Sequence, residues 1–306
     1  GGKEMPGLIT HHIVAESVAE RVDIKYTPAF MLGCLGPDVC YFHRAMPWQR
    51  GSIRAVGKKL HYSPPSELFN VMNRLLLEYR DDAMQSYVEG FLCHYALDST
   101  VHPFVYWSIP QYKSAHGIKF NDSFIHNQIE YKMDALVLDE KYGITVKEYD
   151  LEKVVPTDEK TLTAASKVFS SAVNDLFPSE HLTAATVSQA YTDLSHNTRI
   201  LQNPGAKRQV ICSLERLLHT GPVLSPLFWS EPDHSYDYMN TAHKTWYNPT
   251  DRTEQSTESY IELASRAVDY TVELIGQLRG SLDRNEPVKY SLDKLFVNGK
   301  RIEVKK

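Results

Sequence analysis

Helical periodicity most constrains what this chain can fold into, because apolar residues recur at three- and four-residue intervals through most of it. Prolines and glycines lie between the periodic segments, where helices commonly end. The segments that we expect to be helices cover residues 10–22, 66–80, 84–98, 123–140, 159–176, 182–201, 206–219 and 255–281. No alternation of strands with helices and no glycine-rich phosphate loop interrupts them. The sequence therefore predicts an all-α protein.

Two segments depart from this helical pattern. Residues 287–305 contain short alternating stretches around Asn298-Gly299, a dipeptide typical of tight hairpin turns. We therefore expect one helical domain over residues 5–284 and a short β-hairpin-like tail over 285–306. Residues 229–250 are polar, rich in aromatic side chains and long for a connection in a compact helical protein. Such loops are often functional, and an ordered surface crossover is the alternative.

Composition and charge exclude several classes of protein. The net charge of −5, from 33 basic and 38 acidic residues, argues against binding long nucleic acids by charge. No apolar run approaches the roughly 18–20 residues that span a bilayer, so we expect no transmembrane segment. Four cysteines without a CxxC pair argue against a disulfide scaffold and against a cysteine-only zinc site. The N-terminus shows no signal-peptide pattern, so we expect a cytoplasmic protein.

Two histidine–carboxylate pairs carry the chemistry. His94 and Asp98 are four residues apart, as are His126 and Glu130, so each pair lies on one face of its predicted helix. Such a pair can place a nitrogen and an oxygen on one zinc ion. The neighbours of His94 are apolar, which makes an unpaired Asp98 costly to bury. A metal ion or a buried hydrogen bond would reduce that cost, and both interpretations stay open.

Five segments in order resemble a known family. They read THHIVAESV near the start, LGPD at 35–38, LHYSPPSELF at 60–69, HYALDSTVHPF at 94–104 and HNQIE at 126–130. Together, over residues 5–140, they resemble the zinc-dependent phospholipases C, which share an all-helical fold with the single-strand-specific zinc nucleases. The resemblance implies a hydrolase in which three zinc ions sit in a cleft between helices.

The resemblance also implies which residues hold the metal. The expected ligands are His11, Asp38, His61, His94, Asp98, His102, His126 and Glu130. In this scheme Asp98 bridges two zinc ions, and Asp38 is both a ligand and the candidate catalytic base. His11 is preferred to His12 because the apolar pattern after it fits better.

Two positions depart from the family pattern. His102, which precedes a proline, is favoured as the last histidine ligand, and His116 is its rival. The long spacing from His102 to His126 predicts an insertion over 105–122 beside the cleft. Secreted members complete one zinc site with an N-terminal tryptophan, which the segment before His11 lacks. Either Pro6 becomes the terminus and serves that role or that zinc is weak or absent, so we expect two or three zinc ions.

The resulting hypothesis is a zinc-dependent phosphodiesterase that acts on a phosphodiester or phospholipid-type substrate. One alternative is a zinc enzyme on the same scaffold with different chemistry or a nucleotide substrate. Another is a non-catalytic zinc-binding scaffold. A structural zinc site has four protein ligands, whereas a catalytic site keeps an open position. Aromatic residues such as Trp107, Trp229 and Trp246 would either surround a quaternary ammonium or base, or simply pack the 229–250 loop. The sequence predicts no particular oligomeric state.

Overall fold

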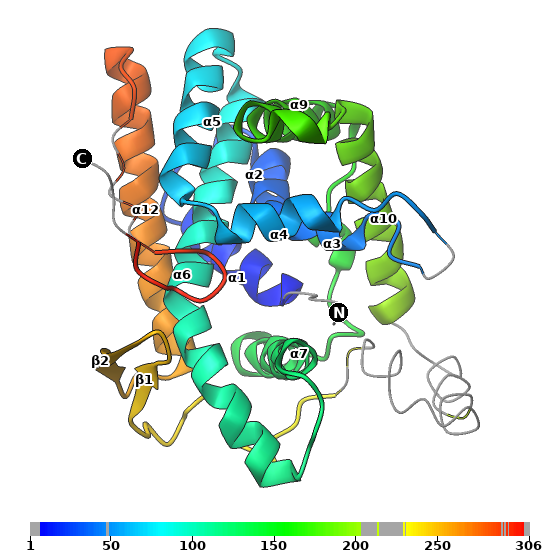
Figure 1. Cartoon of the computed structure of the whole chain (residues 1–306), viewed down its shortest axis with the longest axis vertical. Coiled ribbons are helices and arrows are strands. Elements are labelled where there is room, and N and C mark those ends of the chain that lie inside the picture. Colours follow the sequence, from blue (N-terminus) through cyan, green and yellow to red (C-terminus); the bar gives the residue numbers. More distant parts are fainter. Residues whose placement is uncertain are drawn as a thin grey trace.

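The protein is a bundle of helices of very unequal length (Figure 1). The computed structural model describes residues 7–46, 49–202, 231–288 and 294–302, together with Ser213, Trp229, Tyr290 and Leu292. The α-helices are α1 (Leu8–Ala19), α2 (Thr27–Gly33), α3 (Val39–Phe42), α4 (Arg54–Tyr62), α5 (Pro65–Tyr79), α6 (Asp82–His116), α7 (Asp122–Tyr142), α8 (Leu151–Val154), α9 (Glu159–Leu176), α10 (Ala184–Gln202) and α12 (Tyr260–Arg284). Short 3₁₀ helices are η1 (Gly36–Asp38) and η2 (Pro178–Glu180). The all-α expectation is confirmed.

Helix α6 is the central element, and it packs against α2, α7, α9 and α12. It runs for 35 residues, begins where the Asp81 side chain accepts a hydrogen bond from the Met84 amide, and ends at Gly117 in the left-handed region. It continues through Pro103 and Pro110, so it is longer than the predicted helix 84–98. The predicted insertion over 105–122 is thus mainly an extension of α6. Because α6 has neighbours on several sides, its polar side chains are held inside the protein.

Two glycines bring α2 and α6 into backbone contact. A Cβ atom on Gly33 would lie 2.1 Å from the Tyr87 carbonyl oxygen, and one on Gly90 would lie 2.0 Å from that of Phe30. Only glycine permits so close a crossing. The crossing places the turn after α2 directly beside α6, one helical turn before His94.

The sheet and the tail differ in detail from the prediction. Strands β1 (Trp246–Asn248) and β2 (Asp251–Ser256) pair antiparallel, where a loop and the start of a helix were expected. The predicted tail hairpin contains one antiparallel bridge, between Lys294 and Arg301, with Gly299 at φ +61° in its turn. The predicted helix over 206–219 lies outside the described residues, apart from Ser213, and so does Pro6.

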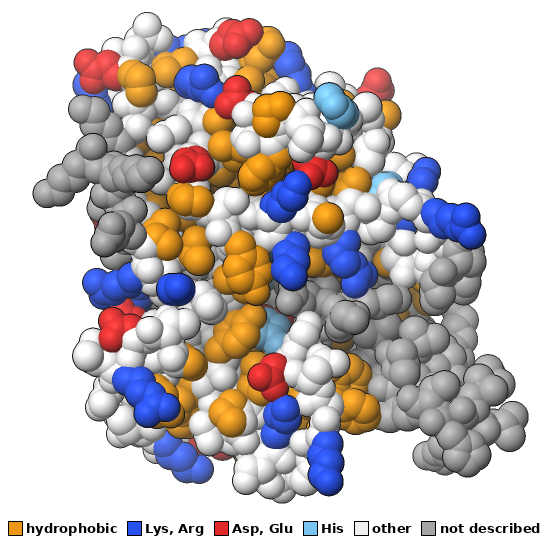
Figure 2. Space-filling view, viewed as in Figure 1, with side chains coloured by type: hydrophobic (Ala, Val, Ile, Leu, Met, Phe, Trp, Pro, Cys, Tyr) orange, Lys and Arg blue, Asp and Glu red, His pale blue; other side chains and the backbone are white. Residues whose placement is uncertain are grey.

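Among the described helices, none has both the length and the apolar character that a bilayer crossing requires. Figure 2 shows Lys, Arg, Asp and Glu side chains scattered among hydrophobic ones over the visible face. Trp229 and Trp246 are buried, so these two rings pack the 229–250 segment onto the helices.

Candidate metal centre

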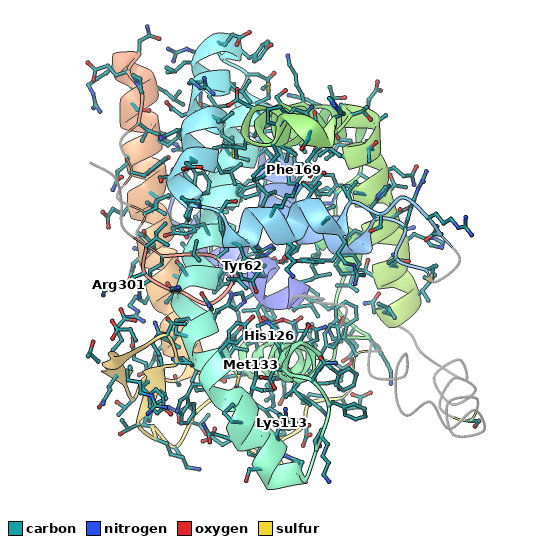
Figure 3. The ribbon with its side chains drawn as sticks, in the orientation of Figure 1. Tyr62, Lys113, His126, Met133, Phe169 and Arg301 are labelled. Carbon is teal, nitrogen blue, oxygen red and sulfur yellow. The ribbon has the colours of Figure 1, made fainter. Side chains whose placement is uncertain are left out.

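Five elements bring the eight predicted ligands together. α1 supplies His11, η1 supplies Asp38 and α4 supplies His61. α6 and α7 supply the remaining five, at the four-residue spacing that keeps them on one face. Figure 3 labels His126 on α7, where that helix packs against α6. All eight side chains are buried, and the most accessible residue, His126, is 7% exposed.

Asp98 lies at the middle of the first group. Its Oδ1 is 3.3 Å from His11 Nε2, and its Oδ2 is 3.1 Å from His94 Nε2. The rings of His11 and His94 stack with centroids 4.5 Å apart. Three ligand atoms from α1 and α6 thus converge at a spacing that allows them to share one metal ion.

A second group lies where α6 faces α7. Glu130 Oε1 is 3.1 Å from His126 Nε2 and 3.3 Å from His102 Nε2. His102 Nε2 is also 3.7 Å from Asp98 Oδ1, so the first and second groups adjoin through this ring. His102, and not its rival His116, therefore lies in the cluster.

The third group surrounds Asp38. Its Oδ1 is 3.0 Å from His61 Nε2, and its Oδ2 is 3.9 Å from His94 Nδ1. Gly36, at φ +50°, permits this arrangement, because a Cβ atom there would lie 2.2 Å from the His94 ring. His94 therefore belongs to the first and the third group.

Three of the histidines are oriented by backbone carbonyl groups. The Nδ1 atoms of His61, His94 and His102 lie 2.8, 3.1 and 2.7 Å from the carbonyl oxygens of Gly57, Cys34 and Phe296. A carbonyl oxygen only accepts, so Nδ1 carries the proton and donates it. In the neutral rings, the lone pair is then on Nε2, which points at a carboxylate. Metal-binding histidines are commonly oriented in this way.

The cluster fits a zinc ion on two further grounds. Within the described part of the chain, His94 Nε2 and Asp98 Oδ2 lie 3.1 Å apart without forming a hydrogen bond, and the buried Glu130 Oε2 has no hydrogen-bond partner. Buried polar atoms are seldom left so, which points to a missing partner. Two atoms that share a tetrahedral zinc at 2.0–2.2 Å lie roughly 3.3–3.6 Å apart, close to the separations of 3.0 to 3.3 Å found here.

Comparison with known families decides the relationship. The family model described as zinc-dependent phospholipase C matches residues 8–180, more than half of the chain. The chain belongs to the zinc-dependent phospholipase C family. Comparisons with curated proteins and with solved structures gave no match. All eight predicted ligands lie inside the matched region, and α10, α12 and the sheet lie outside it.

Without metal, this phospholipase C family member holds the cluster together by ion pairing. Burial lowers the pKa of His102, but the charges of Asp98 and Glu130 outweigh it and raise that pKa to about 10. Burial raises the pKa of Glu130, but His126 and His102 outweigh it and lower that pKa to about 2. Burial also raises the pKa of Asp98, but the nearby His102 and His94 outweigh it and hold that pKa well below its usual range. Both carboxylates are therefore ionised at neutral pH and favour a cation between them.

Sequence reasoning missed the residue that anchors α1. The carboxylate of Asp134 accepts hydrogen bonds from the Thr10 amide (2.8 Å), the Thr10 hydroxyl (2.7 Å) and the Ile9 amide (3.2 Å). These bonds satisfy the free amides at the start of α1, directly before His11. Asp134 is four residues after Glu130, and this spacing was a signal that could have found it.

The other histidines that the structure describes lie outside the cluster. His12 Nδ1 is 2.6 Å from the Tyr149 hydroxyl. His116 is exposed, and its ring lies 4.2 Å from that of Tyr112. His234 Nε2 is 3.1 Å from Asp139 Oδ2 at the surface. His43 is buried on the Asp38 side but makes no ion pair with a carboxylate in the described residues.

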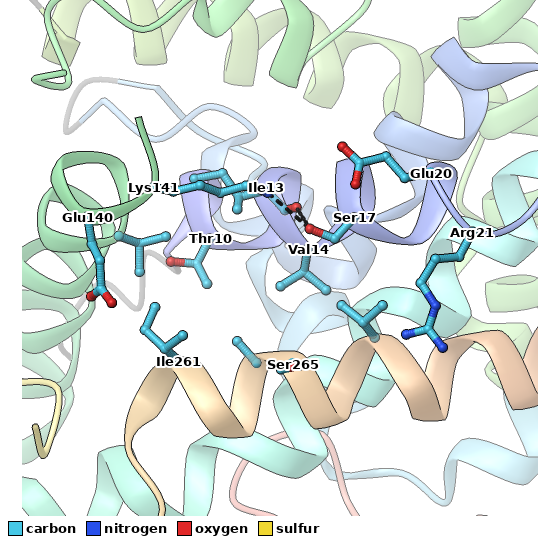
Figure 4. Close-up of a pocket in the computed structure, with 13 residues that line it drawn as sticks. Thr10, Ile13, Val14, Ser17, Glu20, Arg21, Glu140, Lys141, Ile261 and Ser265 are labelled. Carbon is cyan, nitrogen blue, oxygen red and sulfur yellow. Dashed lines mark hydrogen bonds between the residues drawn. The ribbon is translucent and has the colours of Figure 1, made fainter. Parts of the chain in front are cut away.

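A surface groove lies near the cluster but contains none of the eight residues. It has a volume of about 480 Å³ and lies between α1, α7 and α12. Figure 4 shows Thr10, Ile13 and Val14 of α1 facing Ile261 and Ser265 of α12 across it, and Lys141 Nζ lies 3.0 Å from Ser17 Oγ at its wall. The groove is therefore separate from the metal centre.

Proposed function

We propose that this protein is a zinc-dependent phosphodiesterase that hydrolyses a phospholipid-type or other small phosphodiester with two or three zinc ions. The observation that carries the proposal is the cluster of three adjoining groups of buried histidines and carboxylates. A single such group would suffice for one structural ion. Groups that share His94 and adjoin through His102 favour neighbouring ions, which phosphodiester chemistry uses to stabilise the attacking and leaving oxygens.

The residues divide among the ions by their contacts. His11, His94 and Asp98 would hold one ion, and His102, His126 and Glu130 another. Asp98 Oδ2 lies 3.1 Å from His94 Nε2 of the first set, and Asp98 Oδ1 lies 3.7 Å from His102 Nε2 of the second, which supports a bridging role between the two ions. Asp38 and His61 would hold a third ion or share the first, because His94 Nδ1 donates to the Cys34 carbonyl and leaves only Nε2 for metal.

Zinc, when bound, neutralises the phosphate charge and lowers the pKa of a water molecule towards 7. Asp38 is the candidate base. Its Oδ1 faces His61, whereas its Oδ2 has only the longer 3.9 Å contact to His94, so Oδ2 is the oxygen that would accept the proton of a water molecule. Burial of all eight side chains keeps bulk water away and strengthens their charges. His126 on α7 is the most accessible of the eight residues, and we expect substrate to approach from its side of the cluster.

The test compares metal content and hydrolysis in wild type, Asp98→Ala and Asp139→Ala. Asp139 is the matched control, because it also faces a histidine at 3.1 Å but at the surface. We expect two or three zinc ions per wild-type chain, by elemental analysis, and hydrolysis of p-nitrophenyl phosphorylcholine. Asp98→Ala should lose at least one ion and at least about 100-fold in kcat/KM, whereas Asp139→Ala should match wild type. No zinc in the wild type after purification with zinc supplied would refute the proposal.

The near-complete burial of the ligands favours one competing function, a structural zinc scaffold. The two functions differ in whether a ligand can reach the metal. Inorganic phosphate added to the cobalt-substituted protein should change its visible absorption if a metal position is open. Bound metal with an unchanged spectrum and no hydrolysis would favour the scaffold.

A further inference from the structure

A segment far along the chain from the predicted ligands lies against the metal centre. Residues 294–302, here called the C-terminal segment, form a tight turn in which the Leu295 amide bonds to the Lys300 carbonyl at 3.0 Å and the Gly299 amide to the Leu295 carbonyl at 3.1 Å. Phe296, Val297 and Gly299 are buried. In Figure 1 this segment is the red loop that crosses α6. It lies outside the region that matches the family.

The backbone of this segment reaches His102. The Phe296 carbonyl oxygen accepts a 2.7 Å hydrogen bond from His102 Nδ1. This bond orients the ring so that Nε2 faces Glu130 Oε1 at 3.3 Å. His61 and His94 receive the same support from carbonyls inside the family match, at Gly57 and Cys34. Of these three histidines, only His102 takes its support from outside that region.

Close packing at Phe296 and at Gly299 helps to hold the segment in place. The Phe296 ring packs 5.0 Å from the ring of Tyr95 and 5.9 Å from that of His94. At the other end, Gly299 presses against α6, where a Cβ atom would lie 2.6 Å from Pro103 Cγ and 3.1 Å from the Ser99 carbonyl oxygen. Pro103 directly follows His102. The close packing of Gly299 against Pro103 therefore fixes the position of the segment relative to His102.

We propose that the C-terminal segment is a positioning device for His102, and that it tightens the binding of the zinc ion held by His102, His126 and Glu130. The proposal rests on the zinc centre of the proposed function. Without the Phe296 carbonyl, the His102 ring can rotate and place its proton on either nitrogen, and only one of these states offers Nε2 to the metal. Loss of such a supporting partner costs about 10–100-fold in metal affinity.

The test uses two alanine substitutions that differ in one respect. Gly299→Ala and Gly117→Ala both place alanine at positive φ, +61° and +64°, but the new methyl group collides with Pro103 only in the first and meets nothing within 4 Å in the second. Zinc affinity of the full chain is measured by competition with a chelating indicator. We expect Gly299→Ala to bind one ion about 10–100-fold more weakly and the others as wild type, and Gly117→Ala to bind all ions as wild type.

A second measurement covers the case in which Gly299→Ala does not fold. In the zinc-loaded wild type with ¹⁵N-labelled histidine, we expect the His102 signals of a ring protonated at Nδ1 and metal-bound at Nε2. Metal binding through Nδ1, or wild-type zinc affinity in folded Gly299→Ala, would overturn the positioning role alone. A wild type that binds no zinc would overturn both this role and the proposed function. Zinc binding without hydrolysis would refute only the proposed function.

Discussion

At the scale of single residues, Asp134 combines a structural role with an unusual protonation. It is completely buried, and burial raises its pKa to about 6 although three hydrogen bonds from Thr10 and Ile9 favour the ionised form. In the unfolded chain the carboxyl has its ordinary pKa of 3.8. Between these two pH values the folded protein holds a proton that the unfolded chain releases. The stability contributed by this group is therefore full below pH 3.8 and is lost as the pH rises through about 6.

We expect Asp134→Asn to remove this pH dependence, because an amide does not titrate. Relative to the variant, the wild type should lose about 2 kcal/mol of unfolding free energy between pH 4 and pH 7. Urea unfolding of both proteins, each with zinc chelated, measures the difference. Parallel stability curves would show that Asp134 is ionised throughout this range.

The sequence could predict which histidines and carboxylates lie together, but it could not show what orients them. Spacing on α6 and α7 pairs His94 with Asp98 and His126 with Glu130, and the family resemblance favoured His102, which precedes a proline. The carbonyl partners of Gly57, Cys34 and Phe296 carry no sequence signal, because every residue has a carbonyl group. Their positions follow from the tertiary fold alone.

At the scale of elements, a buried ion pair joins α6 to α12. Glu89 has no exposed surface, and its two oxygens lie 2.7 and 3.0 Å from Arg279 Nε and Nη2. A second pair on α12, between Arg21 and Asp269, has both side chains about half-exposed or more. The same kind of contact therefore occurs on one helix in two very different environments.

Arg279→Ala should destabilise the protein by about 2 kcal/mol, because it removes the cation beside the buried Glu89 carboxylate, which keeps a hydrogen bond from the Gln85 amide. Arg21→Ala should cost less than about 1 kcal/mol, because water screens the exposed pair. Chemical denaturation of the two variants beside wild type gives both values. Equal effects would mean that burial does not set the strength of the α6–α12 pair.

Helix positions were predicted well where an amphipathic face packs on the core, as in α9, which the structure gives as Glu159–Leu176. Boundaries were less accurate for α6, because its later turns are stabilised by packing against α7 and β1 despite two prolines. The pair β1–β2 was missed because β2 is a polar, largely exposed strand, Asp251–Ser256, with no apolar alternation. Its neighbour β1 is anchored by the buried Trp246, whose indole donates to the Glu258 carbonyl at 2.9 Å.

At the scale of the whole molecule, the metal centre joins elements that are otherwise separate helices. Its candidate ligands come from α1, η1, α4, α6 and α7, and without an ion their histidines and carboxylates only pair with one another. A metal ion that binds the folded chain stabilises all of these elements at once.

Zinc removal should therefore lower the unfolding temperature of the entire chain in one transition. An ion present at 1,000 times its dissociation constant contributes about 4 kcal/mol. Differential scanning calorimetry with a chelator, and then with zinc restored, checks this, and Asp98→Ala should respond less than wild type. If the unfolding temperature is the same with and without zinc, the centre does not bind metal.

The place of Phe296 in the chain has a consequence for how the protein matures. A ribosome releases all eight candidate ligands by Glu130, but more than half of the chain length separates that residue from Phe296. A nascent chain can therefore collect zinc on His11, His94 and Asp98 before Phe296 is synthesised. His102 gains its supporting carbonyl only after Phe296 has emerged from the ribosome. Synthesis of the 294–302 segment then becomes the step that finishes the metal centre, and a chain terminated before this segment would bind its metal incompletely.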